Sequence, residues 1–301
     1  MLRRPPVGST VKTAHDMGRE FRVLSKLAPV YPKAPRPLVH CDDLAVIGAP
    51  FYLMERIRGI VLRDRRAGGL AIPPERMRRC SEAAVDGLAE LHGIDLEAAG
   101  LADLGRPAGY AARQVAGWGE RWLAAKTDEV PAIDRAFAWL AERIPAESGP
   151  PALLHNDYKY DNLVFSPDLA RVVAVLDWEM ATTGDPRMDL GYTLACWVDP
   201  DDAPHLQALA FGPTALPGNL SRTEVAARYA AATGGGDLGD VLFFYVFGLA
   251  KLAVIAQQIY ARYRRGLTKD ERFARLLDGV RVLGATSTRA IELGRIDRLE
   301  E

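Results

Sequence analysis

The sequence has little cysteine, no excess of charge and no apolar leader, and each shortage argues against a class of protein. Only three cysteines, Cys41, Cys80 and Cys196, occur in 301 residues, and none of them has a paired spacing. A disulfide framework or a zinc site is therefore not expected, and the pattern is typical of a reducing cytoplasm. The formal net charge of −1 argues against a nucleic-acid-binding surface. No apolar run follows the basic residues at the N-terminus, so we expect no signal peptide.

Long apolar runs are also scarce, and the exception is the stretch 241–259. Its length approaches that of a membrane span. Lys251 lies in its middle and Gln257-Gln258 close it. A charge at the centre of a bilayer costs about 2.5–3.5 kcal/mol on insertion scales. The stretch therefore predicts a buried helix of a protein that does not enter a membrane.

The residues 153–180 carry the clearest chemical pattern in the sequence. Two strand-like runs, 163–165 and 172–176, enclose a turn at Ser166-Pro167-Asp168. Asp157 and Asn162 precede the first run, and Asp177 follows the second. A hairpin of this kind can bring the three side chains to one end of a small sheet. Two carboxylates and an amide form a hard-oxygen set suited to Mg²⁺, with one carboxylate left to act as a base.

The order of these residues resembles a known family. His155-Asn156-Asp157 with Asn162, then Asp177-Trp178-Glu179, resembles the catalytic and metal loops of kinase-like phosphotransferases. The run 184–190, Gly-Asp-Pro-x-x-Asp-Leu, is similar to the continuation of that pattern in the aminoglycoside phosphotransferase and choline kinase branch. The nearest resemblance is to the phosphotransferase domain found fused to acyl-CoA dehydrogenases. It extends over nearly the whole chain from residue 2.

The resemblance implies an α+β, protein-kinase-like fold with two lobes. We expect a small and partial N-terminal β lobe over residues 1–57 and a large, mainly helical C-terminal lobe over residues 58–301. Apolar periodicity and turn signals predict the helices 13–28, 73–92, 107–126, 131–144, 189–197, 221–232 and 241–259, with a final helix after 268. Thr13, Ser221 and Thr268 are the expected capping residues of three of them.

The resemblance also implies a transfer of the γ-phosphoryl group of ATP or GTP to a hydroxyl of a small molecule. Asp157 is expected to accept the proton of that hydroxyl, and Lys159 to point at the transferred phosphoryl group. Asn162 and Asp177 are expected to hold Mg²⁺. His155, Asp185 and Asp189 are expected to brace the loops, and Glu179 is interpreted as a bystander.

The nucleotide is expected to bind between the lobes. Arg3, or alternatively Arg4, would hold the inner phosphates and pair with Glu20. The backbone from Glu55 to Ile57 would bind the edge of the adenine. Trp118, Trp122 and Trp139 are interpreted as packing anchors, and the acidic run 199–202 as a solvated turn rather than an acceptor-binding site.

A glycine-rich phosphate loop is missing from the sequence. Gly-x-Gly-x-x-Gly does not occur, and Gly234-Gly235-Gly236 lies near the other end. The resemblance places two strands and this loop before Leu2, so either the start lies further upstream or the protein lacks this part. We therefore expect weak nucleotide binding from the chain as it stands, and an alternative function as a silent, kinase-like nucleotide-binding protein. A metal-dependent hydrolase using His155, Asp157, Asp177 and Asp185 fits less well.

Overall fold

The computed structural model describes residues 1–6, 16–64, 66–236 and 238–300. In chain order the strands are β1 (Leu2–Arg3), β2 (Pro37–Cys41), β3 (Phe51–Met54), β4 (Ala152–Leu154), β5 (Leu163–Phe165), β6 (Val172–Val175) and β7 (Thr182–Gly184). The first helices are α1 (Met17–Leu27), α2 (Leu44–Ile47), α3 (Pro74–His92), α4 (Tyr110–Ala125) and α5 (Pro131–Glu142). The later helices are α6 (Pro186–Ala195), α7 (Pro204–Gln207), α8 (Arg222–Ala232), α9 (Val241–Arg264) and α10 (Leu276–Leu293). Short 3₁₀ turns are η1 (Ala67–Gly69), η2 (Tyr160–Asn162), η3 (Trp178–Met180) and η4 (Glu271–Arg275).

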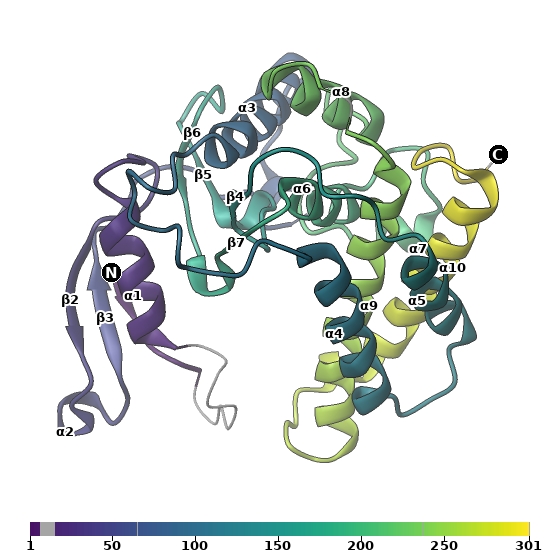
Figure 1. Ribbon diagram of the computed structural model, residues 1–301, viewed down its shortest axis with the longest axis horizontal. Helices are drawn as coiled ribbons and strands as arrows, with labels where there is room; N and C mark the ends of the chain where they lie inside the picture. Colours follow the sequence, from purple (N-terminus) through teal and green to yellow (C-terminus); the bar gives the residue numbers. More distant parts are fainter. Residues whose placement is uncertain (7–15, 65, 237, 301) are drawn as a thin grey trace.

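A small antiparallel sheet and the helix α1 form one end of the molecule (Figure 1). The strand order is β1-β3-β2, and Arg3 pairs with Tyr52 across the sheet. Helix α1 buries Met17, Val23, Leu24 and Leu27 on one face, as its apolar spacing of three and four predicts. The sheet and this helix together make the small β part that the sequence predicts.

Asp16 caps helix α1. Its side chain accepts a hydrogen bond from the backbone N–H of Arg19 at 2.8 Å. The expected cap, Thr13, lies outside the described residues. Asp is as good an N-cap as Thr because its carboxylate also interacts favourably with the helix dipole.

One short hairpin and a second pair of strands carry the residues of the predicted chemical site. Strand β5 pairs with β6 in an antiparallel register, Leu163 opposite Val175, and β4 pairs with β7. All residues of β4 and β5 are buried. The loops at the ends of these strands are therefore fixed to the core, as the predicted hairpin requires.

Helices form the rest of the molecule, with α9 at their centre (Figure 1). Helix α9 is long and apolar enough to cross a membrane by length and composition alone, but 72% of its most apolar window is buried. It contacts α4, α5, α6 and α10. It is the core helix that the sequence predicts.

One local element was missed and one predicted cap was wrong. Helix α2 was not predicted, and it is a single turn capped by Asp43 and closed by Gly48 in the left-handed conformation. Thr268 does not start the last helical segment. Asp270 caps η4 instead by accepting from the N–H of Arg272 at 3.0 Å, and α10 follows. Asp270, two residues after Thr268, supplies the side-chain oxygen that caps the helix, so Thr268 does not act as the cap.

Candidate active site

Asp157 lies at the centre of a cluster of polar side chains. Its Oδ1 accepts a hydrogen bond from the hydroxyl of Tyr192 at 2.8 Å. Its Oδ2 accepts from Lys159 Nζ at 2.5 Å and from Asn162 Nδ2 at 2.8 Å. The structure therefore brings together three of the predicted residues, Asp157, Lys159 and Asn162, and adds Tyr192, which the sequence analysis missed.

The charged side chain of Lys159 is mostly enclosed by the protein. The side chain is 12% exposed and its Nζ also lies 3.5 Å from Asp161 Oδ1. Burial lowers the pKa of Lys159, but Asp157 and Asp161 more than offset this, and the net shift is upward. The ammonium group is thus available as a permanent cation next to the carboxylate.

The backbone of Asn156 is held in an unusual conformation just before Asp157. Its φ is +65°, in the left-handed region that Asn tolerates better than most residues. Its N–H donates to Asp189 Oδ1 at 2.8 Å. The N–H of His155 donates to Asp189 Oδ2 at 2.6 Å, and the His155 ring bonds to the carbonyl of Leu176. His155 and Asp189 therefore brace the loop, as the sequence predicts.

Asp189 is buried and remains a carboxylate because its partners stabilise the charge. Burial opposes ionisation, but the hydrogen bond and charge of His92, together with His155, lower the pKa of Asp189 below its usual value. His92 Nε2 lies 3.3 Å from Asp189 Oδ2, and His92 Nδ1 lies 2.6 Å from the hydroxyl of Tyr229. His92 is a structural residue at the end of α3.

Asp177 follows strand β6 and lies beside Arg3. Its φ is +70°, and Arg3 forms an ion pair with its Oδ1. The N–H of Leu176 donates to the carbonyl of Asn162 at 2.8 Å, which places the two predicted metal ligands on neighbouring segments. Glu179 Oε2 lies 3.2 Å from Arg3 Nη2, so this carboxylate takes part in the ion-pair cluster.

The predicted pair of Arg3 and Glu20 is present. Arg3 Nε lies 2.8 Å from Glu20 Oε2, whereas Arg4 is exposed and reaches only the carbonyl of Ile47. Of the two arginines, Arg3 and Arg4, it is therefore Arg3 that pairs with Glu20. Burial raises the pKa of Glu20 to about 7, although Arg3 opposes this shift.

Helix α1 is attached to the segment after Asp177 by further hydrogen bonds. Glu20 Oε1 accepts from the N–H of Trp178 at 3.1 Å, and Arg19 donates to the carbonyls of Glu179, at 2.8 Å, and Ala181. Arg19 was not identified from the sequence, because an arginine on a helix surface carries no signal of its partner.

The segment after β3 has two backbone groups that form no hydrogen bond with the described residues. The N–H of Glu55 donates to the carbonyl of Arg36 at 2.9 Å. In the part of the chain that the structure describes, the carbonyl of Glu55 and the N–H of Ile57 form no hydrogen bond. One acceptor and one donor two residues apart can bind the edge of a purine.

The oxygens around Asp177 suit a hard divalent cation. The side-chain Nδ2 of Asn162 donates twice to Asp157, once to its backbone carbonyl and once to its carboxylate. The side-chain Oδ1 of Asn162 accepts no hydrogen bond from the described residues. This oxygen and the Asp177 carboxylate are the ligand types that Mg²⁺ takes, together with phosphate oxygens and water. No group of three or more His, Cys, Asp or Glu side chains placed to hold a metal occurs over residues 1–6, 16–64, 66–236 and 238–300.

The hydrolase alternative loses two of its proposed ligands. The His155 ring is bonded to a backbone carbonyl, and Asp185 forms an ion pair with Arg187 at 2.7 Å while capping α6. Both side chains are occupied in structural contacts.

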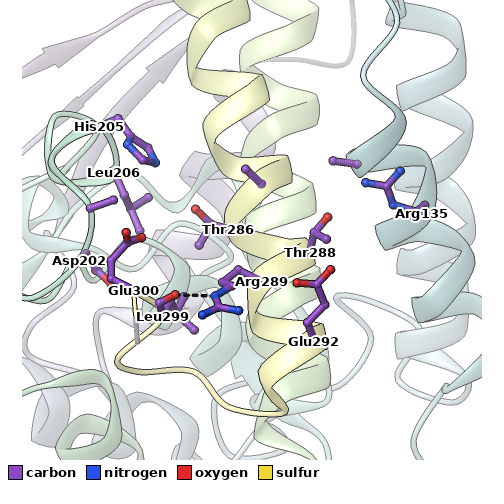
Figure 2. A pocket seen from close by; sticks show the side chains of 13 residues that line it. Arg135, Asp202, His205, Leu206, Thr286, Thr288, Arg289, Glu292, Leu299 and Glu300 are labelled. Carbon is purple, nitrogen blue, oxygen red and sulfur yellow. Dashed lines mark hydrogen bonds between the residues drawn. The ribbon is translucent and has the colours of Figure 1, made fainter.

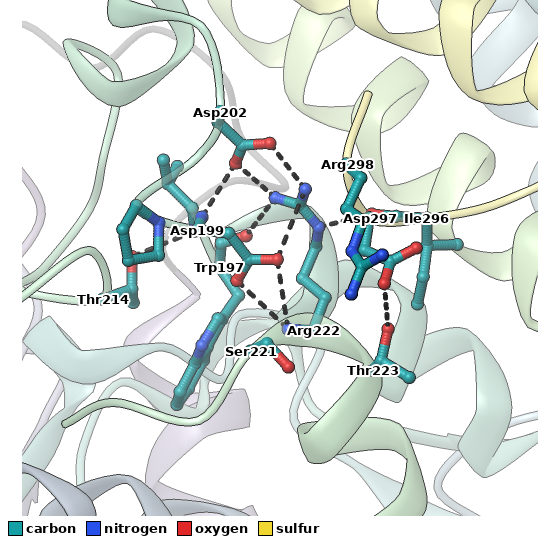
Figure 3. Close-up of polar contacts among 12 residues, drawn as sticks. Trp197, Asp199, Asp202, Thr214, Ser221, Arg222, Thr223, Ile296, Asp297 and Arg298 are labelled. Atoms are coloured by element: carbon teal, nitrogen blue, oxygen red, sulfur yellow. Dashed lines mark hydrogen bonds and ion pairs between the residues drawn. The ribbon is translucent and has the colours of Figure 1, made fainter. Parts of the chain in front are cut away.

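The loop after α6 differs from its prediction. Asp199 and Asp202 are 2% and 4% exposed, so the segment 199–202 is not a solvated turn. Figure 3 shows both carboxylates turned toward the guanidinium of Arg222. Asp202 Oδ1 accepts from Arg222 Nη2 at 2.6 Å, and Asp199 Oδ1 accepts from the N–H of Arg222 at 3.1 Å. The prediction was wrong because the partner lies some 20 residues further along the chain, where sequence spacing gives no signal.

A cavity of about 620 Å³ between α5, α7 and α10 lies outside this cluster (Figure 2). Its lining mixes Arg135, His205, Arg289, Glu292 and Glu300, most of them exposed. None of the predicted site residues lines it. The candidate active site is therefore formed by the side-chain clusters around Asp157 and Asp177, on segments joined by the backbone hydrogen bond from Leu176 to Asn162.

Comparisons with known proteins agree with this geometry. The sequence model described as the phosphotransferase enzyme family matches residues 1–232. The protein named acyl-CoA dehydrogenase family member 11 from Gallus gallus is 36% identical over 273 residues, which are 90% of this chain and 35% of that protein. Its Homo sapiens counterpart is 35% identical over 275 residues, 90% of this chain and 34% of that protein. The chain thus spans about a third of the length of these curated relatives.

Solved structures share the fold. A protein from Ralstonia eutropha assigned to the aminoglycoside phosphotransferases has a TM-score of 0.79 and 31% identity, over 94% of this chain and 83% of that one. An aminoglycoside phosphotransferase from Streptomyces rimosus, solved with ADP and streptomycin, has a TM-score of 0.54 and 19% identity, over 83% and 85%. Plasmodium vivax ethanolamine kinase has a TM-score of 0.61 and 10% identity, over 94% and 74%. The fold is therefore α+β and kinase-like.

Proposed function

This chain belongs to the phosphotransferase enzyme family, and from this premise we propose that it transfers the γ-phosphoryl group of ATP or GTP to a hydroxyl of a small molecule. The observation that carries the proposal is the cluster at Asp157. A lysine ammonium and an amide both lie within hydrogen-bonding distance of one carboxylate, and these are the groups that phosphoryl transfer uses.

In the proposed reaction Asp157 accepts the proton of the attacking hydroxyl. The oxygen of that hydroxyl forms the new bond to phosphorus while the bond to the bridging oxygen of the nucleotide breaks. Lys159 turns from Asp157 toward the oxygens of the transferred group, and Tyr192 holds the second oxygen of Asp157 in place. Mg²⁺ on Asn162 and Asp177 would supply neutralisation of the phosphate charge.

The nucleotide would lie between the sheet β1-β3-β2 and the β5–β6 hairpin. Arg3, oriented by Glu20, is the proposed contact of the inner phosphates. The carbonyl of Glu55 and the N–H of Ile57 are the proposed contacts of the purine edge. Since Arg3 pairs with Asp177, binding of Mg-nucleotide requires Arg3 to move its contact from this carboxylate to phosphate.

The acceptor is proposed only as a class. Solved neighbours carry streptomycin in one case and the name ethanolamine kinase in another, and the curated relatives are named acyl-CoA dehydrogenases. A test panel therefore includes aminoglycosides, sugars, amino alcohols such as choline and ethanolamine, and hydroxyacyl compounds. A cytoplasmic enzyme without nucleic-acid or membrane partners is the proposed setting.

The proposal is tested in two steps. A thermal-shift screen with ATP and GTP, each with and without Mg²⁺, identifies the nucleotide. Transfer of labelled γ-phosphate to the acceptor panel then identifies the reaction. Mg²⁺-dependent binding and a phosphorylated acceptor are expected. Binding without transfer across the panel would favour the alternative of a silent nucleotide-binding protein, and absence of nucleotide binding would contradict both.

A further inference from the structure

A lysine lies in the middle of the core helix α9, where its neighbours along the helix are apolar. Lys251 is 2% exposed, and its neighbours Ala250, Leu252, Ala253 and Val254 are buried as well. Burial lowers the pKa of its ammonium group to about 8. Removing an ammonium from water is costly, so such a residue persists only when specific partners compensate for the lost hydration.

Lys251 contacts three residues, and two of them, Asn156 and Tyr192, adjoin the proposed base. Its Nζ donates to the backbone carbonyl of Asn156 at 2.8 Å. The same nitrogen lies 4.1 Å from the ring centroid of Tyr192 and 5.6 Å from that of Trp118, both in cation–π range. Tyr192 in turn donates to Asp157 Oδ1 at 2.8 Å. Lys251 thus reaches Asp157 by two routes, through the preceding peptide and through the phenol.

The carbonyl of Asn156 belongs to the peptide that joins it to Asp157. A non-glycine residue at φ +65° stays there only when several contacts hold it. Asp189 accepts from its N–H, Tyr110 donates to its Oδ1 at 3.2 Å, and its Nδ2 donates to the carbonyl of Met180 at 3.2 Å. Lys251 bonds to the remaining polar group of Asn156, its backbone carbonyl. It is the one cation among these four partners of Asn156.

The charges that surround Lys251 come from two directions. Asp189 and Cys196 face it from α6, and Asp157 and Lys159 from the loop. Asp189 and Asp157 favour the charged ammonium and Lys159 opposes it, whereas burial raises the pKa of the Cys196 thiol and keeps it neutral. Both carboxylates therefore stabilise the ammonium group that bonds to the Asn156 carbonyl.

We propose that Lys251 is a positioning residue for phosphoryl transfer: its ammonium fixes the Asn156–Asp157 peptide and the Tyr192 ring, and so sets where the Asp157 carboxylate meets the acceptor hydroxyl. The proposal rests on the proposed function for its effect on rate. Lys251 does not touch nucleotide or acceptor, so its loss acts on turnover and leaves substrate binding largely intact.

The test replaces Lys251 with Met, which keeps the length of the side chain and removes the charge and the donor. Gln257→Met is the matched control. Gln257 is also a buried polar residue of α9, and its Nε2 donates to the carbonyl of Ala125 at 3.0 Å and to Thr127, away from the loop. Both variants lose a buried polar group of the same helix, but only one loses a contact to the residue before Asp157.

Two readouts are compared on the folded variants. Lys251→Met is expected to lower kcat by about 10–100-fold, because a small misplacement of a reacting group costs this much, with acceptor KM and nucleotide affinity within about threefold. It is also expected to accelerate hydrogen exchange of the amides over residues 155–160. Gln257→Met is expected to change neither.

Each result decides the proposal. Unchanged exchange over residues 155–160 in Lys251→Met would overturn it, and so would a kcat within about threefold of the parent protein or a fall in kcat matched by Gln257→Met. If the parent protein phosphorylates no acceptor, the proposed function fails. The exchange measurement then decides by itself whether Lys251 fixes the Asn156–Asp157 peptide.

Discussion

At the scale of single residues, the candidate site depends on two backbone conformations that few side chains adopt. Asn156 and Asp177 have φ values of +65° and +70°. Such conformations cost about 1–3 kcal/mol each and persist where the surroundings hold them. Asp189 holds the first through the N–H of Asn156. At the second, Arg3 pairs with the side chain of Asp177. The strain is therefore located at the residue before the proposed base and at the proposed metal ligand.

Replacing Asp177 with Ala is expected to remove most of the Mg²⁺-dependent nucleotide affinity, by about tenfold or more, with a modest loss of stability because Ala tolerates the left-handed conformation less well than Asp. The carboxylate is about one-third exposed and lies at a strand end, so the core does not depend on it. Calorimetric titration with and without Mg²⁺ measures the effect. Asp201→Ala, which removes an exposed carboxylate outside the site, serves as the control. Equal affinities in the parent and Asp177→Ala proteins would remove Asp177 from the metal site.

The residue types of the site could be predicted from the sequence, but several of their contacts could not. The spacing of Asp157, Asn162 and Asp177 identified the cluster, because short loops at the ends of a hairpin leave little freedom. Tyr192 and Lys251 were missed as its supports. Tyr192 lies three residues after Asp189, on the same face of α6, and this spacing was the available signal. The lysine was noticed only as an argument against a membrane span.

At the scale of elements, the site depends on the close crossing of α6 and α9. Gly191 and Gly248 face one another there, and a Cβ on Gly191 would meet the carbonyl oxygen of Phe244 at 2.2 Å. Both helices carry residues that support the loop, Asp189 and Tyr192 on α6 and Lys251 on α9. A wider crossing would therefore move both supports of Asp157.

Gly191→Ala is expected to destabilise the protein by about 1–3 kcal/mol, since a methyl group would have to push the two helices apart. Urea unfolding measures the change. Gly119→Ala is the matched control. It also lies within a helix, α4, where an added Cβ meets only ordinary contact with Phe137 at 3.6 Å. It should be neutral or stabilise by up to about 1 kcal/mol through helix propensity. Equal effects of the two substitutions would contradict the close crossing.

The loop between α6 and α7 contains two carboxylates that share one guanidinium. Burial raises the pKa of Asp199 to about 7, although Arg222 opposes the shift, and Asp202 adds to it. An unfolded aspartate has a pKa of about 3.9. The folded protein therefore keeps a proton here between about pH 4 and pH 7 that the unfolded chain releases. The stabilisation from this group is complete below pH 4 and is lost as the pH rises through 7.

Asp199→Asn is expected to remove this pH dependence. Between pH 5 and pH 8 the parent protein should lose about 1–3 kcal/mol more of its free energy of unfolding than the variant does. Urea unfolding of both proteins at the two pH values gives the comparison. Glu20, whose pKa burial also raises to about 7, contributes equally to both and cancels. Parallel changes in the two proteins would contradict the raised pKa of Asp199.

Most helices and strands could be predicted from the sequence because their apolar periods and caps are local. The capping box of Ser221 and Glu224 is present, and α3 ends at Gly93 as expected. The buried character of Asp199 and Asp202 could not be predicted, since a run of acidic residues looks solvated until its partner, Arg222, is known. Local patterns therefore determine elements, and long-range ion pairs determine which polar residues become core.

At the scale of the whole molecule, the small sheet and α1 are joined to the helical part through the proposed site itself. Arg3 from β1 and Glu20 from α1 form one ion-pair cluster with Asp177 and Glu179 from the segment after β6. The proposed base, Asp157, is supported instead by α6, through Tyr192, and by α9, through the bond of Lys251 to the carbonyl of Asn156. The proposed nucleotide contacts and the proposed proton acceptor thus come from different parts of the chain. The division at residue 58 remains a prediction.

The most direct test of this account is the rate of γ-phosphate transfer by Asp157→Asn, measured with the nucleotide and acceptor that the screen identifies. The substitution keeps the size of the side chain and removes the proton acceptor. The rate is expected to fall by about 10²–10⁴-fold, with nucleotide affinity within a few-fold of the parent protein. Asp168→Asn, in the turn of the same hairpin, should stay within about twofold. A rate for Asp157→Asn within a few-fold of the parent protein would contradict the assignment of Asp157 as the base.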